Sequence, residues 1–206
     1  SEMNACCQHH ERDPGLADPR YRRVLWAVMS ANAAMFVVEL SAGLFARSVA
    51  LQADALDFLG DALTYGISLA VLGMSLKRHA SAAMLKGVTM GLFGFWVIGV
   101  TAQRALAGIV PDAPVMGVVG ALALVVNLGA ALALYRYRAG DANMRSVWLC
   151  TRNDAISNVA VMLAALGVWG ASSGWPDLVV GGLMGGLALW SSVQVLGQAR
   201  GELKSA

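Results

Sequence analysis

Residues 49–76 read VALQADALDFLGDALTYGISLAVLGMSL, an apolar run that is interrupted by three aspartates. An α-helix needs about 20 mostly apolar residues to cross the hydrocarbon core of a bilayer. The run is continuous rather than alternating, which favours a membrane helix over a barrel strand. Charges inside such a span are costly, so these aspartates are expected to face the interior of a bundle and to serve function.

The composition of the whole chain agrees with this interpretation. The 206 residues are 57% hydrophobic and only 14% charged, against about 25% charged residues in soluble domains. The mean hydropathy is +0.60. Lipid must therefore solvate much of the surface. The net charge of +2 and the lack of a basic aromatic patch give no support for nucleic-acid binding, and three cysteines make no disulfide framework.

Five further apolar runs are long enough to span a bilayer. They cover roughly residues 24–46, 82–107, 114–134, 146–170 and 176–196. The sequence thus predicts an all-α integral membrane protein with six transmembrane helices. We expect a polar tail at 1–19 with a Cys/His cluster, a membrane domain at 20–200 and a short tail at 201–206, with no soluble domain.

Basic residues predict the orientation of this bundle. With six spans, both termini share one side with the loops after the second and fourth spans. That side holds Arg12, Arg20, Arg22, Arg23, Lys77, Arg78, Arg136, Arg138, Arg145, Arg200 and Lys204. Positive charge is typical of cytoplasmic loops, so both termini are predicted to be cytoplasmic.

The aspartates of the second span carry the first chemical signal. Asp57 and Asp61 are four residues apart and therefore stack on one helix face, which Asp54 largely shares. Like charges stacked in a low dielectric repel each other, and either a divalent cation or protons relieve the repulsion. Two structural alternatives stay open. Asp54 could merely cap the helix, and the other two could pair with a basic residue inside a span, either Lys86 or Arg152.

The fifth span holds a second pair at the same spacing, Cys150 and Asp154. Two helices that each offer such a pair can enclose one ion in a tetrahedral site, the geometry that Zn²⁺ prefers. A buried cysteine alone is usually a small hydrophobic residue, and that alternative stays open for Cys150.

These segments together resemble the cation diffusion facilitator family of metal exporters. The resemblance lies in residues 32–62 around Asp54, Asp57 and Asp61, in residues 143–164 around Cys150 and Asp154, in Val-Asn127-Leu, and in Trp175-Pro-Asp177. It extends over nearly the whole chain from about residue 20. The sequence is thereby identified as a secondary active transporter rather than an enzyme.

The resemblance implies a transport site and a mechanism. The metal ligands would be Asp57, Asp61, Cys150 and Asp154, and the ion path would pass near Glu39, Asp54 and Asn127. Members of the family load metal from the cytoplasm and release it outward by alternating access in exchange for protons. We expect Zn²⁺ as the main substrate, with Cd²⁺ and then Co²⁺ or Ni²⁺ as further ones, no cofactor beyond this metal, and a bacterial inner membrane as the location.

The chain departs from the family pattern at three places. Cys150 stands where the family usually has His, and a thiolate makes the site softer, which favours Zn²⁺ or Cd²⁺. The family usually continues into a cytoplasmic ferredoxin-like domain, whereas this sequence ends at Ala206. The chain is either a natural short form or a truncated one, and a homodimer of it would be held by membrane helices. Glycines of the third span offer close-packing faces for it, namely Gly87, Gly91, Gly94 and Gly99.

The third departure is the loop between the fourth and fifth spans, which lacks the histidines usual in the family. The N-terminal tail instead carries a cluster that either captures soft metal or is incidental: Cys6, Cys7, His9 and His10.

Two other classes of function compete with transport. A membrane sensor or scaffold would bind metal without moving it, and flux measurements separate it from a transporter. A membrane metalloprotease would need a motif such as His-Glu-x-x-His, which the sequence lacks.

Overall fold

The computed structural model describes residues 19–70, 76–135 and 142–205. Within these ranges, the side chains of residues 68, 70, 76–79, 142–152, 202 and 205 lie outside this description. The described residues form six α-helices and no strand. The helices are α1 (Pro19–Phe45), α2 (Val49–Ala70), α3 (Leu76–Ala107), α4 (Ala113–Tyr135), α5 (Ala142–Ala171) and α6 (Trp175–Ser205). The predicted all-α architecture is confirmed.

The helix boundaries lie close to the predicted spans except at two places. One is α6, which continues to Ser205 and so includes most of the predicted tail at 201–206. The other is the junction between α2 and α3. Leu76 was predicted to end the second span, but it is the first residue of α3. The basic residues at 77–79 therefore belong to the start of α3 rather than to a loop. Hydropathy could not locate this junction, because the apolar run continues past the end of α2 at Ala70 without a charged residue to mark it.

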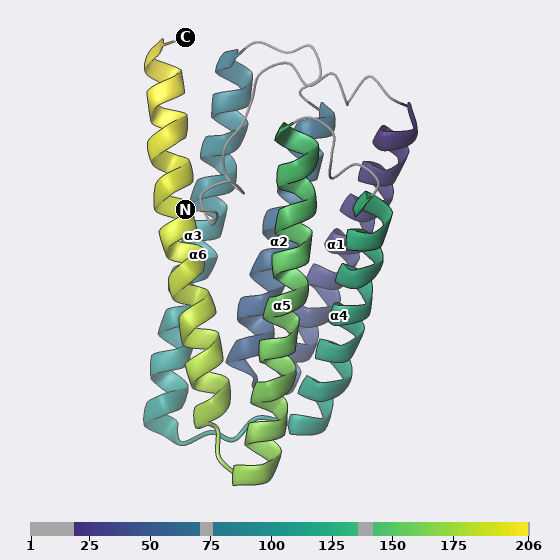
Figure 1. The fold of residues 1–206 in the computed structure, drawn as a ribbon. Coiled ribbons are helices and arrows are strands. Elements are labelled where there is room, and N and C mark those ends of the chain that lie inside the picture. The colour runs from purple at the N-terminus through teal and green to yellow at the C-terminus, as the bar shows by residue number, and fades with distance from the viewer. Residues whose placement is uncertain (1–18, 71–75, 136–141, 206) are drawn as a thin grey trace.

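Successive helices run in opposite directions, and the two ends of the described chain lie at the same end of the bundle (Figure 1). The short connections at 46–48, 108–112 and 172–174 lie at the opposite end. Below, we call these the terminal end and the loop end. An even number of spans produces this arrangement, as the sequence predicts.

Three helix pairs build the bundle, and α2 holds them together. The closest associations are α3 with α6, α1 with α2, and α4 with α5. In addition, α2 packs against α3, α5 and α6, which makes it the central helix (Figure 1). The three aspartates predicted to carry chemistry therefore lie on the helix with the most neighbours.

The glycines of α3 serve packing within the chain, which corrects the prediction of a dimer face. Gly87, Gly91 and Gly94 lie against α6, where an added Cβ would come within 2.7–2.9 Å of an α6 side chain. Of the four glycines, only Gly99 meets no other atom within 4 Å. Small residues allow two membrane helices to approach closely, and here they do so for α3 and α6 of one chain.

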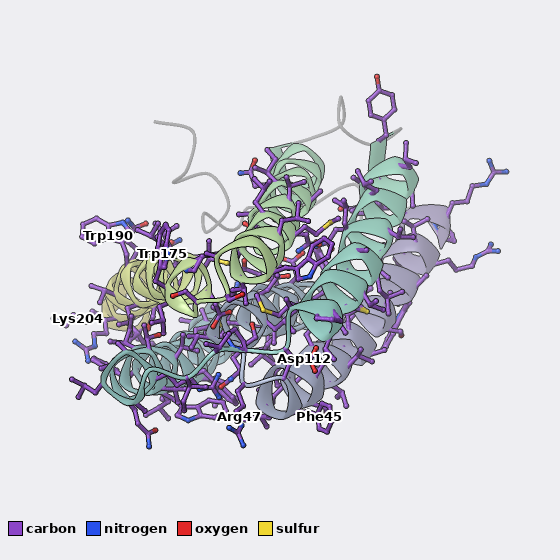
Figure 2. All side chains as sticks on the ribbon, turned by 90° about the horizontal axis from the view of Figure 1, so that it is seen from below. Phe45, Arg47, Asp112, Trp175, Trp190 and Lys204 are labelled. Carbon is purple, nitrogen blue, oxygen red and sulfur yellow. The ribbon has the colours of Figure 1, made fainter. Side chains whose placement is uncertain are left out.

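The outer surface of the bundle is suited to lipid. Large apolar side chains point away from the helices, and Phe45 and Trp190 show this in the view from the loop end (Figure 2). Five described helices are long and apolar enough to cross a membrane. The sixth, α2, carries three aspartates within its 22 residues but is enclosed by its neighbours. The chain is a multi-pass membrane protein.

Two apolar clusters close the interior of the bundle at its two ends. The cluster at the terminal end includes Tyr21, Leu25 and Leu134, and the one at the loop end includes Leu51 and Met116. Polar side chains occupy the interior between these clusters. They form the candidate site.

Candidate metal centre

A hydrogen-bonded corner fixes the beginning of α2. The Oγ of Ser48 accepts a hydrogen bond from the Leu51 N–H at 3.1 Å, which is a regular N-cap. Asp177 of α6 adds a second cap, accepting hydrogen bonds from the Val49 N–H at 2.7 Å, the Ala50 N–H at 2.9 Å and the Ser48 hydroxyl at 2.6 Å. A carboxylate is favourable at this positive end of a helix. The register of α2 against α6 is thereby fixed.

The structure brings Asp61 and Asp154 together from α2 and α5. Their carboxyl groups lie close enough to interact with each other directly. The second oxygen of Asp154, Oδ2, has no hydrogen-bond partner among the described residues. Asp57 interacts electrostatically with both. We refer to Asp57, Asp61 and Asp154 as the acidic trio, and all three side chains are partly exposed.

The trio alone does not form a complete metal site within the described residues. In the described part of the chain, no three His, Cys, Asp or Glu side chains form a group that could hold a metal. Cys150 belongs to α5, but its side chain is among those outside the description. The four-ligand tetrahedral site therefore stays a prediction. The cluster of Cys6, Cys7, His9 and His10 lies wholly outside the described residues.

Two polar side chains interact with Asp61. The hydroxyl of Tyr65, one turn further along α2, donates a hydrogen bond to Asp61 Oδ2 at 2.6 Å. Lys86 of α3 interacts electrostatically with Asp61, and its ammonium group donates a hydrogen bond to the hydroxyl of Thr64. The alternative that a basic residue inside a span pairs with the aspartates is therefore correct for Asp61, which lies beside Lys86. Arg152, the other basic candidate, has no described side chain.

Asp54 belongs to a second polar group, toward the loop end. The amide nitrogen of Asn158 donates hydrogen bonds to both oxygens of Asp54, at 3.0 and 2.9 Å. The amide oxygen of Asn158 accepts one from Asn127 Nδ2 at 3.2 Å. Glu39 of α1 interacts electrostatically with Asp54. We call Glu39, Asp54, Asn127 and Asn158 the sealed network, because each of them is at most 1% exposed.

The alternative interpretation of Asp54 as a helix cap is wrong. Ser48 and Asp177 cap α2, whereas Asp54 lies further inside the helix and contacts α5. Asn158 connects Asp54 with Asn127, and Glu39 lies beside Asp54, so these three residues are neighbours. Their place near the ion path stays a prediction. Sequence analysis missed Asn158. Its spacing of four residues from Asp154 would have indicated it, since that spacing continues the same face of α5.

A bundle of membrane helices around a buried acidic centre is the pattern of an ion-transporting membrane protein. The cation efflux transmembrane domain matches residues 25–203 of the chain. This match extends over most of the chain, and the chain belongs to the cation efflux family. A search of curated proteins gives no significant match. The protein is accordingly a membrane transporter for the efflux of metal cations.

Proposed function

We propose that the protein exports Zn²⁺ from the cytoplasm by alternating access, in exchange for protons. Cd²⁺ is the second substrate, and Co²⁺ and Ni²⁺ follow. The transport ligands are Asp57, Asp61 and Asp154 with Cys150 as the fourth. The observation that carries this proposal is the contact between the carboxyl groups of Asp61 and Asp154 on neighbouring helices.

The chemistry of this carboxyl pair supports both a divalent cation as the substrate and the proton as the counter-ion. Two carboxyl groups in contact hold at least one proton between them in the absence of a cation. A divalent cation that binds between them displaces this proton, because a metal ligand must be deprotonated. Metal and proton thus exclude each other at Asp61 and Asp154, which is the condition for exchange.

The donor set supports the choice of metal. Three carboxylates and a thiolate combine hard and soft ligands, and a four-ligand set of this kind suits Zn²⁺. The thiolate of Cys150 extends the range to the softer Cd²⁺. A substitution of Cys150 by His restores the usual family residue, so we expect the ratio of Cd²⁺ to Zn²⁺ transport to fall. An unchanged ratio would remove Cys150 from the ligand set.

The direction of transport is proposed from the loop charges. The terminal end carries most of the arginines and lysines, so we assign this end to the cytoplasm of a bacterial inner membrane. Access of a membrane-impermeant thiol reagent to a cysteine at Ser172, in the loop end, tests this assignment. Labelling from the external side is the expected result, and labelling only from the cytoplasmic side would reverse the direction.

The decisive experiment measures flux rather than binding. Inside-out vesicles with an imposed proton gradient should take up Zn²⁺, and both Asp61→Ala and Asp154→Ala should abolish the uptake. Asp112→Asn is the matched control, because Asp112 is an exposed acid in the loop before α4 that only caps that helix. Undiminished uptake in both variants would refute the site. Metal binding without flux in the wild type would indicate a sensor or scaffold.

A homodimer through the membrane helices is part of the proposal. Gly87, Gly91 and Gly94 of α3 are excluded from its interface, because α6 fills the space above them. Cross-linking of the protein in native membranes tests the dimer, and a monomer at every cross-linker concentration would refute it.

A further inference from the structure

The sealed network contains a pair of carboxyl groups that the transport site does not use. Glu39 and Asp54 face each other across α1 and α2, and neither side chain has measurable exposure. Among the described residues, no amide, hydroxyl or basic group donates to either oxygen of Glu39, whose carboxyl group contacts that of Asp54. The amide oxygen of Asn127 lacks a donor in the same way. Buried oxygens without donors are costly unless something compensates them.

The position of this network relative to the acidic trio follows from helix geometry. On α2, Asp54 precedes Asp57 by three residues, which is a rise of about 4.5 Å. On α5, Asn158 follows Asp154 by four residues, a rise of about 6 Å. Because α2 and α5 run in opposite directions, both displacements point toward the loop end (Figure 1). The sealed network therefore lies about one helical turn from the trio, on its loop side.

The available oxygens match a cation rather than a further hydrogen-bond donor. Glu39 offers two, Asn127 offers one, and Asp54 offers two that the amide nitrogen of Asn158 now covers. In the described residues, Asn158 donates to both oxygens of Asp54, the carboxyl groups of Glu39 and Asp54 contact each other, and no basic side chain hydrogen-bonds to Glu39. Two neighbouring carboxylates without a basic partner need a positive charge to be stable as anions.

We propose that Glu39, Asp54 and Asn127 form a second divalent-cation station, which receives the metal from the acidic trio before release at the loop end. This inference rests on the proposed function and adds a step to it. The donors are carboxylate and amide oxygens only, so the station binds Mn²⁺ and similar hard ions well and holds Zn²⁺ less tightly than a site with a thiolate. A weaker second station favours onward movement of the metal.

Asn158 covers the Asp54 carboxylate of the second station. Its amide nitrogen covers both oxygens of Asp54, and it lies on the same face of α5 as Asp154. For a cation to reach Asp54, the amide of Asn158 must turn away or present its oxygen instead. Asn158 is therefore a positioning residue, which keeps the second station closed while it donates to Asp54.

Metal stoichiometry tests the second station directly. The full chain is purified in detergent with Cys6, Cys7, His9 and His10 replaced by Ser, so that the tail cannot contribute. Bound and free Mn²⁺ are then separated by electron paramagnetic resonance. We expect about two bound Mn²⁺ per chain, about one in Glu39→Gln and about one in Asp61→Asn, with none in the double variant. Ser192→Ala, a buried polar residue between α3 and α6, is the control and should keep both ions.

The outcomes separate this proposal from the proposed function. Two ions in Glu39→Gln would refute the second station. If Glu39→Gln loses one bound Mn²⁺ and Asp61→Asn keeps both, the second station is supported and the transport site at Asp61 is refuted. If Glu39→Gln does not fold, Asp54→Asn replaces it with the same expectation. In vesicles, Glu39→Gln should slow Zn²⁺ uptake about tenfold while Zn²⁺ still binds to the trio, whereas an unchanged rate would contradict a role in release.

Discussion

The acidic trio and the sealed network contain similar chemistry in different surroundings. Asp57, Asp61 and Asp154 are partly exposed, while Glu39 and Asp54 are fully buried one helical turn away. In the trio, a tyrosine and a lysine lie beside Asp61. Within the described residues, the only groups that donate hydrogen bonds to the buried pair are side-chain amides. The comparison teaches that exposure, rather than the kind of carboxylate, distinguishes the proposed transport site from the proposed second station.

The largest expected effect separates the two groups by transport rate. Asp154→Asn removes a proposed ligand and should lower Zn²⁺ uptake by about 100-fold or more, whereas Asn158→Ala removes a positioning residue and should lower it about tenfold. Initial rates of ⁶⁵Zn²⁺ uptake in vesicles measure both. If both variants lose the same fraction of the uptake rate, Asp154 and Asn158 do not differ as ligand and positioning residue.

A second prediction concerns the corner that supports both groups. Asp177→Ala deprives three buried donors of their acceptor and should cost about 2–3 kcal/mol of stability. Asp112→Ala removes an exposed cap of α4 and should cost about 1 kcal/mol or less. Thermal unfolding in detergent compares the two. A smaller loss for Asp177 would show that α2 does not depend on this cap.

Chemical labelling tests the difference in exposure itself. In a background with Cys6, Cys7 and Cys150 replaced by Ser, Asp57→Cys should react with a small water-soluble thiol reagent at least about tenfold faster than Asp54→Cys, because a buried thiol needs local opening to react. Mass spectrometry follows the reaction over time. Equal rates would mean that water reaches both groups.

The smallest effect is expected from Lys86. Its ammonium group lies beside Asp61 and competes with an incoming cation, so Lys86→Met should tighten Zn²⁺ binding at the trio by up to about fivefold. Lys86→Arg keeps the charge and is the control. The Mn²⁺ affinity of the sealed network should stay the same, and a parallel change there would show that the two groups are not independent.

The sequence predicted the six helices, because each is a long apolar run, and it predicted the closeness of α2 and α5 through the spaced residues of both. It did not predict the double cap by Asp177 or the bond from Asn158 to Asp54, because these contacts join residues more than 100 positions apart. It also misassigned the α3 glycines. A glycine-rich face indicates that a helix packs closely, but not whether its partner belongs to the same chain.

The capped corner at Asp177 has a mechanical consequence. Three hydrogen bonds hold the first residues of α2 to α6, so this end of α2 cannot slide while they persist. Asp61 lies twelve residues beyond Val49, which corresponds to a lever arm of about 18 Å. A tilt of about 10° around the corner would therefore move Asp61 by about 3 Å, a distance longer than a zinc–oxygen bond. A pivot at the loop end thus lets a small tilt of α2 move Asp61 far enough to make or break a bond to the proposed metal.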